Sequence, residues 1–344
     1  MARVKLEDVC ERGSSNLKQS DVVDKDGDYP IYGASGYIGN VDFYHQEQPY
    51  VAVVKDGAGI GRTTLHPAKS SVIGTMQYLL PKDNVLPEYL CYVVKYMHLE
   101  KYFTGATIPH IYFKDYKNEE FNLDSLDRQK EIVSTLHKIE KVIESRTKEL
   151  ELLDELIRAR FVEMFGNCKD LKSMNELCSI ITDGTHQPPK FQEVGIPFIF
   201  VSNLVNNTVT YNAEKFISEE TYDELYKRTP IEIGDLLLST VGSYGHPAVV
   251  TEDKKFLFQR HIAYLKPKRD IVNSYYLHSA LLAPDGQRQI EEKVKGIAQK
   301  TLNLSEIRKI MIPIPDIEEQ NEFEQFVEKV NKSKFAVHII FNRG

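Results

Sequence analysis

The sequence predicts an α+β protein made of two similar α/β domains, each followed by a long helix. The chain resembles itself over two halves, each half opens with short extended runs and Gly-rich turns, and each half ends in an amphipathic segment. The predicted parts are a first domain over 1–124, a long helix over 125–166, a second domain over 167–315 and a distal helix over 316–344.

The two copies keep their ends and differ inside. The openings around Cys10 and Cys178 match at an offset of 168 residues, whereas Gly105 and Gly296 match at an offset of 191. The second copy therefore holds 23 more residues in its interior. A shared scaffold with differently specialised loops has this pattern.

Short strands and one short helix are expected in each copy, in mixed or antiparallel sheets. In the first copy the strands cover 50–55 and 71–80 and the helix covers 86–97. In the second copy the strands cover 197–201, 235–241, 248–251 and 262–265, and the helix covers 274–282. Tyr78 and Tyr264 occupy matching strands and are predicted to lie in the core.

The first long helix carries an apolar seam at alternating steps of three and four residues, which is typical of a coiled coil. Its positions are Ile132, Leu136, Ile139, Ile143, Arg146, Leu150, Leu153, Ile157, Arg160 and Met164. The two arginines either set register or meet a partner, or they are solvated at the edge of the seam.

The distal helix repeats this seam only at Phe323, Val327 and Val330, and the pattern fades after Lys334. An offset of 191 would carry the helix to about residue 356, so the sequence predicts a shortened helix. The first helix is expected to pair with it near Leu136, which leaves Leu153 beyond the paired section.

Composition restricts the class of protein only in part. A net charge of −7 argues against a simple basic nucleic-acid binder, but the acidic residues are spread along the chain and leave room for small basic faces. The four cysteines form no C-x-x-C pair, which favours reduced thiols in the cytoplasm. We see neither a secretory leader nor a run of eighteen apolar residues, so no membrane partner is expected.

No catalytic or cofactor motif stands out. Gly57-x-Gly59-x-Gly61 precedes a predicted strand, not a helix, which favours a β-turn over a nucleotide loop. The sequence contains no Walker A loop and no histidine cluster with metal-ligand spacing, so neither cofactor nor metal is expected. The 183–186 segment, Asp-Gly-Thr-His, favours a turn with a DNA-facing imidazole over a catalytic pair.

Several short motifs, taken together, resemble type I restriction-modification specificity subunits. The 183–186 segment followed by Gly-Ile-Pro-Phe-Ile at 195–199 resembles that family's D-G-T-H-x-x-P and G-I-P-F-I pattern. The 314–320 segment resembles its I-P-x-P-x-x-E-Q entry into a conserved helix, with Leu-Asp-Arg-Gln at 126–129 as the counterpart in the first copy. Tyr-Gly-Ala-Ser-Gly at 32–36 resembles its Y-G-A-S-G turn.

The resemblance implies two target-recognition domains held apart by two antiparallel conserved helices. Each domain would read one half of a bipartite site in double-stranded DNA. The helices would set the spacer and dock two N6-adenine methyltransferase subunits, and a restriction/translocase subunit would join through that complex. A helix over 127–165 is roughly 58 Å long, more than the roughly 34–36 Å that separates sites one helical turn apart.

Residues for DNA contact are expected on loops, where basic, amide, hydroxyl and aromatic side chains can bond phosphates and base edges. The candidates in the first domain are Tyr32, Ser35, Tyr37, Lys55, Arg62, Thr107, His110 and Lys114. The candidates in the second domain are His186, Lys190, Asn203, Ser243, Tyr244, Gln259, Arg260 and Lys300.

Two other functions stay open at this point. The chain could be a free-standing DNA-binding regulator that dimerises through its coiled coil, which a neighbouring methyltransferase gene would argue against. It could also be a DNA methyltransferase itself. The sequence lacks an Asn/Asp-Pro-Pro-Tyr/Phe motif, which argues against the methyltransferase, and no catalytic residue is expected.

Overall fold

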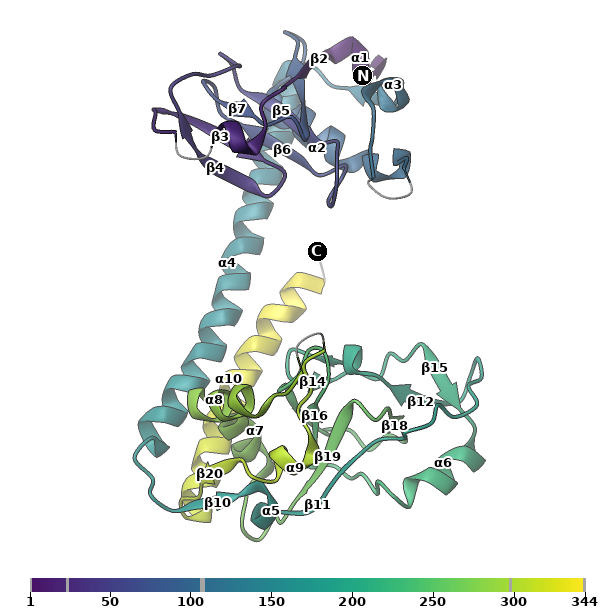
Figure 1. Cartoon of the computed structure of the whole chain (residues 1–344), viewed down its shortest axis with the longest axis vertical. Helices are drawn as coiled ribbons and strands as arrows, with labels where there is room; N and C mark the ends of the chain where they lie inside the picture. Colours follow the sequence, from purple (N-terminus) through teal and green to yellow (C-terminus); the bar gives the residue numbers. More distant parts are fainter. Residues whose placement is uncertain (1, 23–24, 106–108, 297–298, 343–344) are drawn as a thin grey trace. The chain divides into compact units, whose positions relative to one another are not determined.

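The structure is a computed structural model that describes residues 2–22, 25–105, 109–296 and 299–342, with side chains as far as Lys334. The chain divides into two compact units, Met1–Glu144 and Ser145–Gly344 (Figure 1). The helix α4 (Leu126–Phe165) passes through the division between them.

The first unit is built around strand β5 (Tyr50–Val54), which is buried along its whole length. The sheet order is β2-β8-β5-β6, with β2 at Cys10–Ser14, β8 at Met76–Pro81 and β6 at Thr63–His66, and all pairs are antiparallel. Alternate side chains of β5 enter two different cores, because successive residues of a strand point to opposite faces. One of these cores includes residues of helix α2 (Pro87–Tyr96).

The remaining elements of the first unit surround this sheet. A three-stranded sheet has the order β4-β3-β7 and a two-stranded sheet pairs β1 with β9. Their bounds are β1 Ala2–Lys5, β3 Tyr29–Gly33, β4 Gly36–Val41, β7 Ser71–Val72 and β9 Glu120–Leu123, with helices α1 Leu6–Val9 and α3 Phe113–Tyr116 and 3₁₀ turns η1 Gln19–Asp21 and η2 Leu99–Tyr102.

The second unit contains a six-stranded sheet in the order β11-β19-β16-β17-β14-β13, and its first four strands repeat the order of the first unit. These strands are β11 Cys178–Asp183, β13 Leu204–Val205, β14 Thr208–Val209, β16 Leu236–Ser239, β17 Pro247–Val249 and β19 Ile262–Pro267. The repeat extends to single contacts. The backbone N–H of Lys82 donates to Val9 O at 2.9 Å, and that of Lys268 donates to Leu177 O at 2.8 Å. The predicted repeat is therefore confirmed at the level of the backbone.

The two smaller sheets of the second unit also repeat those of the first, with one antiparallel and one parallel pair in the three-stranded sheet and an antiparallel pair in the two-stranded sheet. A three-stranded sheet has the order β15-β12-β18, and a two-stranded sheet pairs β10 with β20. The bounds are β10 Leu171–Ser173, β12 Ile196–Ile199, β15 Lys215–Ile217, β18 Leu257–Phe258 and β20 Met311–Pro313, with helices α5 Met174–Leu177, α6 Glu219–Tyr226, α7 Ser274–Leu282, α8 Pro284–Lys293, α9 Leu304–Ile307 and α10 Ile317–Asn342 and the 3₁₀ turn η3 Val201–Asn203.

Several predictions for single elements are confirmed. The helix expected over 274–282 is α7, and the segment after the Gly-rich turn is the strand β6, as the β-turn interpretation requires. Tyr78 and Tyr264 both have an exposed fraction of 0 %. Both are core residues, as predicted.

Helix α10 packs antiparallel to the C-terminal part of α4 within the second unit (Figure 1). The rings of Phe323 and Phe161 have centroids 5.5 Å apart, and those of Phe323 and Phe165 are 5.6 Å apart. Further along α10, Lys334 forms an ion pair with Asp154. The residue numbers thus rise along α10 while they fall along α4.

This pairing corrects one of our expectations about the helices. The paired section of α4 contains Asp154 and Phe165, so Leu153 lies beside it, not beyond it, and the predicted pairing near Leu136 is wrong. The antiparallel order itself is the one that the resemblance implies. The backbone of α10 is helical to Asn342, although the seam fades after Lys334. Over the described residues α10 has 26 residues and α4 has 40.

One buried glutamine joins each long helix to its own domain in the same way. Gln129 accepts from the N–H of Leu86 at 2.8 Å and donates to Asn84 O at 3.0 Å and Asp124 O at 2.9 Å. Both Gln129 and its repeat partner have an exposed fraction of 0 %. The resemblance had placed this residue in the helix-entry motif without giving it a role.

The partner in the second copy, Gln320, makes the same three bonds. It accepts from the N–H of Asn273 at 2.9 Å and donates to Ile271 O at 3.2 Å and Pro315 O at 2.9 Å. Each glutamine thus satisfies three backbone groups that would otherwise be buried without partners. We call this arrangement the glutamine clamp.

Candidate nucleic-acid interface

A loop in the first unit is held against the turn between β5 and β6. Thr104 and His110 exchange both backbone hydrogen bonds at 2.8 Å, and the N–H of Gly57 donates to Pro109 O at 3.0 Å. Gly105 has a φ of +99°, in the region that favours glycine. We call residues 104–110 the first stapled loop. Thr107, one of the predicted contacts, lies outside the described residues.

The second unit holds a loop by the same backbone bonds. Lys295 and Thr301 exchange hydrogen bonds at 3.0 and 2.8 Å, and the N–H of Gly242 donates to Lys300 O at 3.4 Å. Gly296, the repeat partner of the first loop's glycine, has a φ of +104°. Residues 295–301 are therefore the second stapled loop, and the two copies place it identically against their sheets.

Side chains around the first stapled loop are charged and aromatic. His110 Nδ1 lies 2.6 Å from an oxygen of Asp56, and Lys55 Nζ lies 3.8 Å from the other oxygen of that carboxylate. The His110 ring stacks on Tyr112 with centroids 6.4 Å apart, and Lys114 Nζ lies 5.3 Å from the centroid of the tyrosine ring. Lys55, His110 and Lys114, three of the predicted contacts, are thus brought together.

The other described candidates of the first domain lie on the β5–β6 turn and on the hairpin of β3 and β4. Arg62 donates to Ala34 O at 3.0 Å, which ties the β5–β6 turn to the 33–36 turn. Ser35 and Tyr37 are exposed on this hairpin. Tyr32 is half-buried instead, with its ring 4.4 Å from that of His66. Burial raises the pKa of Tyr32, so its hydroxyl stays protonated and can still donate.

The 183–186 segment of the second unit forms a turn next to strand β18. Asp183 contacts His186 Nε2 at 3.0 Å and pairs with the Arg228 guanidinium at 2.8 Å, so its carboxylate has partners on two sides. A Cβ on Gly184 would lie 2.1 Å from Phe258 O, so only glycine allows this approach. Backbone crowding therefore explains the glycine of this segment.

A polar cavity of about 280 Å³ lies beside this turn and the second stapled loop. Its lining combines donors and acceptors: Asp183, Thr240, Val241, Arg260, His261, Gln299, Thr301, Leu302, Asn303 and Leu304. Of these only Arg260 was predicted from the sequence. The others lie on segments that sequence spacing does not bring together, although the repeat pairs Thr301 with His110.

Tyr244 and Lys300 form a second cluster at this loop. Lys300 Nζ lies 3.2 Å from the tyrosine hydroxyl and 2.9 Å from Glu291, and the tyrosine hydroxyl donates to the same carboxylate. The Glu291 carboxylate and the tyrosine hydroxyl raise the pKa of Lys300, which keeps it cationic. These two predicted contacts lie together, with an acidic neighbour that the prediction did not include.

The other candidates of the second domain are separate. Ser243 and Lys190 are exposed and Gln259 is half-buried on the segment that pairs with Thr185. Asn203 differs, because its side chain is 8 % exposed and bonds Asn212 O and the N–H of Phe200, both at 3.0 Å. Its amide is used within the fold, so we remove it from the candidate interface.

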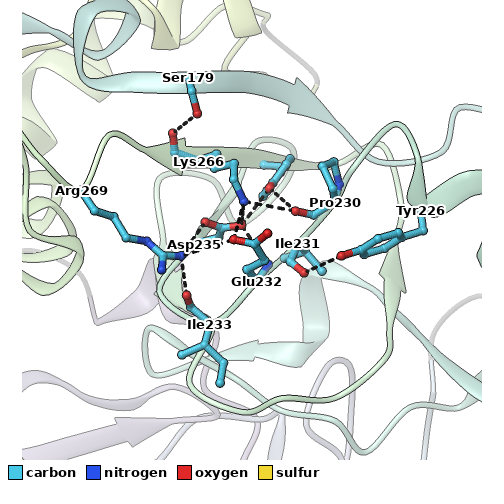
Figure 2. Close-up of polar contacts among 10 residues, drawn as sticks. Ser179, Tyr226, Pro230, Ile231, Glu232, Ile233, Asp235, Lys266 and Arg269 are labelled. Carbon is cyan, nitrogen blue, oxygen red and sulfur yellow. Dashed lines mark hydrogen bonds and ion pairs between the residues drawn. The ribbon is translucent and has the colours of Figure 1, made fainter.

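A buried charge cluster in the second unit stabilises the domain without an open ligand position (Figure 2). Asp235 is fully buried and accepts from Tyr264 at 2.8 Å. Lys266 and Arg269 each lie 3.3 Å from the carboxylate, and the N–H of Glu232 donates to it at 2.9 Å. The carboxylate is therefore satisfied from within the chain.

The thiols and the possible metal ligands suggest no further chemistry. All four cysteines are free, and burial raises the pKa of Cys10 and of Cys178 to about 12, so these thiols are not nucleophiles at neutral pH. Across the described residues we find no group of three or more His, Cys, Asp or Glu that could hold a metal ion. Within the same part of the chain, no helix is both long and apolar enough to cross a bilayer.

Comparison with known proteins identifies relatives of both halves. The family profile described as "Type I restriction modification DNA specificity domain" matches residues 1–155 and 170–338. The chain is 33 % identical over 147 residues to the type I restriction enzyme EcoBI specificity subunit of Escherichia coli, a match that covers 43 % of this chain and 31 % of that protein. It is 20 % identical over 307 residues to the MjaVIII specificity subunit of Methanocaldococcus jannaschii, covering 82 % of this chain and 72 % of that protein.

A solved structure supports the fold. The crystal structure of the type I restriction-modification S subunit from M. genitalium matches with a TM-score of 0.55, at 14 % sequence identity, over 99 % of this chain and 94 % of that chain. At this identity the similarity supports the architecture alone.

Proposed function

This chain belongs to the type I restriction modification DNA specificity family, and from that premise we propose that each of its two domains reads one half of a bipartite site in double-stranded DNA. The observation that carries this proposal is the pair of stapled loops. The backbone holds both loops by the same bonds, while the side chains that surround them differ. A scaffold that recognises two different half-sites requires this combination.

The proposed DNA contacts are the exposed or half-exposed candidates around these loops and their neighbouring turns. They supply the two kinds of group that DNA recognition needs, which are cations for phosphates and amide, hydroxyl or imidazole groups for base edges. In the first domain they are Tyr32, Ser35, Tyr37, Lys55, Arg62, His110 and Lys114, and Thr107, which lies outside the described residues, is retained from the sequence alone. In the second they are His186, Lys190, Ser243, Tyr244, Gln259, Arg260 and Lys300.

The long helices, in this proposal, set the spacer and dock the methyltransferase subunits, two per complex. Apolar side chains of α4 support this, because Ile139 is 49 % exposed and Val142 is 57 % exposed. Ile143 continues the same face one step further and is also exposed. Large apolar side chains at helical spacing on a surface indicate a binding partner.

The catalytic steps belong to partner subunits in this account. A methyltransferase subunit would modify adenine, and a restriction/translocase subunit would join through the same complex. The chain itself would contribute only recognition and assembly, in the cytoplasm where its DNA target lies. The absence of a cofactor motif from the sequence supports this division.

The purified full chain is therefore expected neither to methylate DNA nor to bind S-adenosylmethionine, and to gain methylation activity when a family methyltransferase subunit is added. Calorimetric titration of the cofactor and a radiolabelled methyl-transfer assay, each with and without the added subunit, check this. Stoichiometric cofactor binding by the chain alone would contradict the proposal and favour a methyltransferase.

A further inference from the structure

The side-chain pair between Asp56 and His110 is not needed to shape the first stapled loop. The second stapled loop has the same backbone bonds, yet Val241 and Thr301 stand at the equivalent positions. The side chain of Val241 cannot accept a hydrogen bond from Thr301, so the second loop is held by its backbone hydrogen bonds. The pair in the first domain therefore requires an explanation other than loop stability.

The pair fixes the orientation of the imidazole. The Asp56 carboxylate lies 2.6 Å from Nδ1 of His110, so the proton is on Nδ1. Nε2 has no hydrogen-bond partner within the described part of the chain. Stacking on Tyr112 restrains the ring from one face, and the side chain is still 37 % exposed. A fixed ring with one nitrogen open to solvent can bond a base edge at low entropic cost.

The surroundings suit DNA better than a small ligand. Lys55 lies beside the Asp56 carboxylate and Lys114 lies over the Tyr112 ring, so both groups that contact the imidazole carry a cation next to them. Arg62 lies on the neighbouring turn. In protein–DNA interfaces, cationic side chains bind the phosphates near a residue that contacts a base edge. The residues around His110 have this combination.

We propose that His110 is a specificity-determining residue that reads one base pair of the first half-site through Nε2, and that Asp56 is its positioning residue. Thr301 occupies the corresponding reading position of the second domain. This inference rests on the proposed function, because it needs the first domain to contact DNA.

The test selects preferred duplexes from a randomised pool with the full chain assembled with its methyltransferase partner. In His110→Ala and Asp56→Ala, discrimination at one base pair of the first half-site is expected to fall by about 5- to 30-fold, as for the loss of one base contact. Asp56→Asn is expected to keep the preference, since its amide oxygen still accepts from Nδ1. The matched control, Thr301→Ala, is expected to change only the second half-site. Thermal melts confirm that each variant is folded.

Other results of this selection would contradict separate parts of the proposal. If His110→Ala keeps every wild-type preference, the reading role is overturned. The positioning role is overturned if Asp56→Ala behaves as wild type, or if Asp56→Asn loses as much as Asp56→Ala. If the wild-type assembly selects no sequence at all, the proposed function fails, which is a separate result.

Discussion

Phe323→Ala is expected to lower the free energy of unfolding of the second unit by about 3–5 kcal/mol, the range for a large aromatic removed from a core. Phe323 is fully buried, and its ring packs on Phe161 and Phe165 of α4 and on Tyr276 of α7. One substitution therefore removes the contact that joins three helices. Urea denaturation of the full chain, followed by hydrogen exchange within residues 145–334, measures the loss.

Phe326→Ala is the matched control, because it removes the same side chain from the same helix at a half-buried position. Its loss should be clearly smaller. Equal losses for the two variants would mean that α10 does not pack on α4 through Phe323.

Gln320→Ala is expected to cost about 2–4 kcal/mol, because it leaves the N–H of Asn273 and the carbonyls of Ile271 and Pro315 without partners in a buried site. The equivalent glutamine of the first copy allows an independent test of the same effect. Gln129→Ala should cost a similar amount in the first unit, since it breaks the same three bonds.

Gln325→Ala controls for the loss of a glutamine from α10, because Gln325 is exposed. Exposed substitutions of this kind change stability by no more than about 0.5 kcal/mol. Chemical denaturation of the three variants gives the comparison. If Gln320→Ala matched Gln325→Ala, the glutamine clamp would have no energetic role.

Sequence reasoning predicted the elements whose signal is local or repeated. The run at 50–55 is β-branched and became the central strand β5, and helix α7 lies where the sequence placed it. The repeat then paired Tyr78 with Tyr264 and Gly105 with Gly296, and in the structure both tyrosines are fully buried and both glycines have a positive φ. At these positions the local sequence pattern and the comparison of the two copies lead to the same prediction.

The positions that were missed depend on contacts distant in sequence. A seam specifies which helix face is apolar but not which part of a partner it meets, so the pairing near Leu136 was wrong. The loop-like polarity of Asn203 gave no sign that Asn212 and Phe200 would use its amide.

Of the reading site that we propose, the sequence suggested the cations and the imidazole of His110, but neither Asp56 nor Tyr112. Asp56 was not among the candidates, because a carboxylate is repelled by phosphates when it is considered alone. Asp56 matters through its contact with His110, and the two residues are 54 positions apart in the sequence, with no pattern that would pair them. Comparison of the two copies identifies it, since Val241 replaces it in an otherwise equivalent loop.

Methylome sequencing of cells that express this chain with its methyltransferase partner tests the two-reader account most directly, when residues 170–315 are exchanged for the second domain of another family member. The account predicts that the methylated motif changes in one half-site only, with the other half and the spacer length unchanged. A simultaneous change in both half-sites would contradict the account, as would an exchange that leaves the motif unaltered.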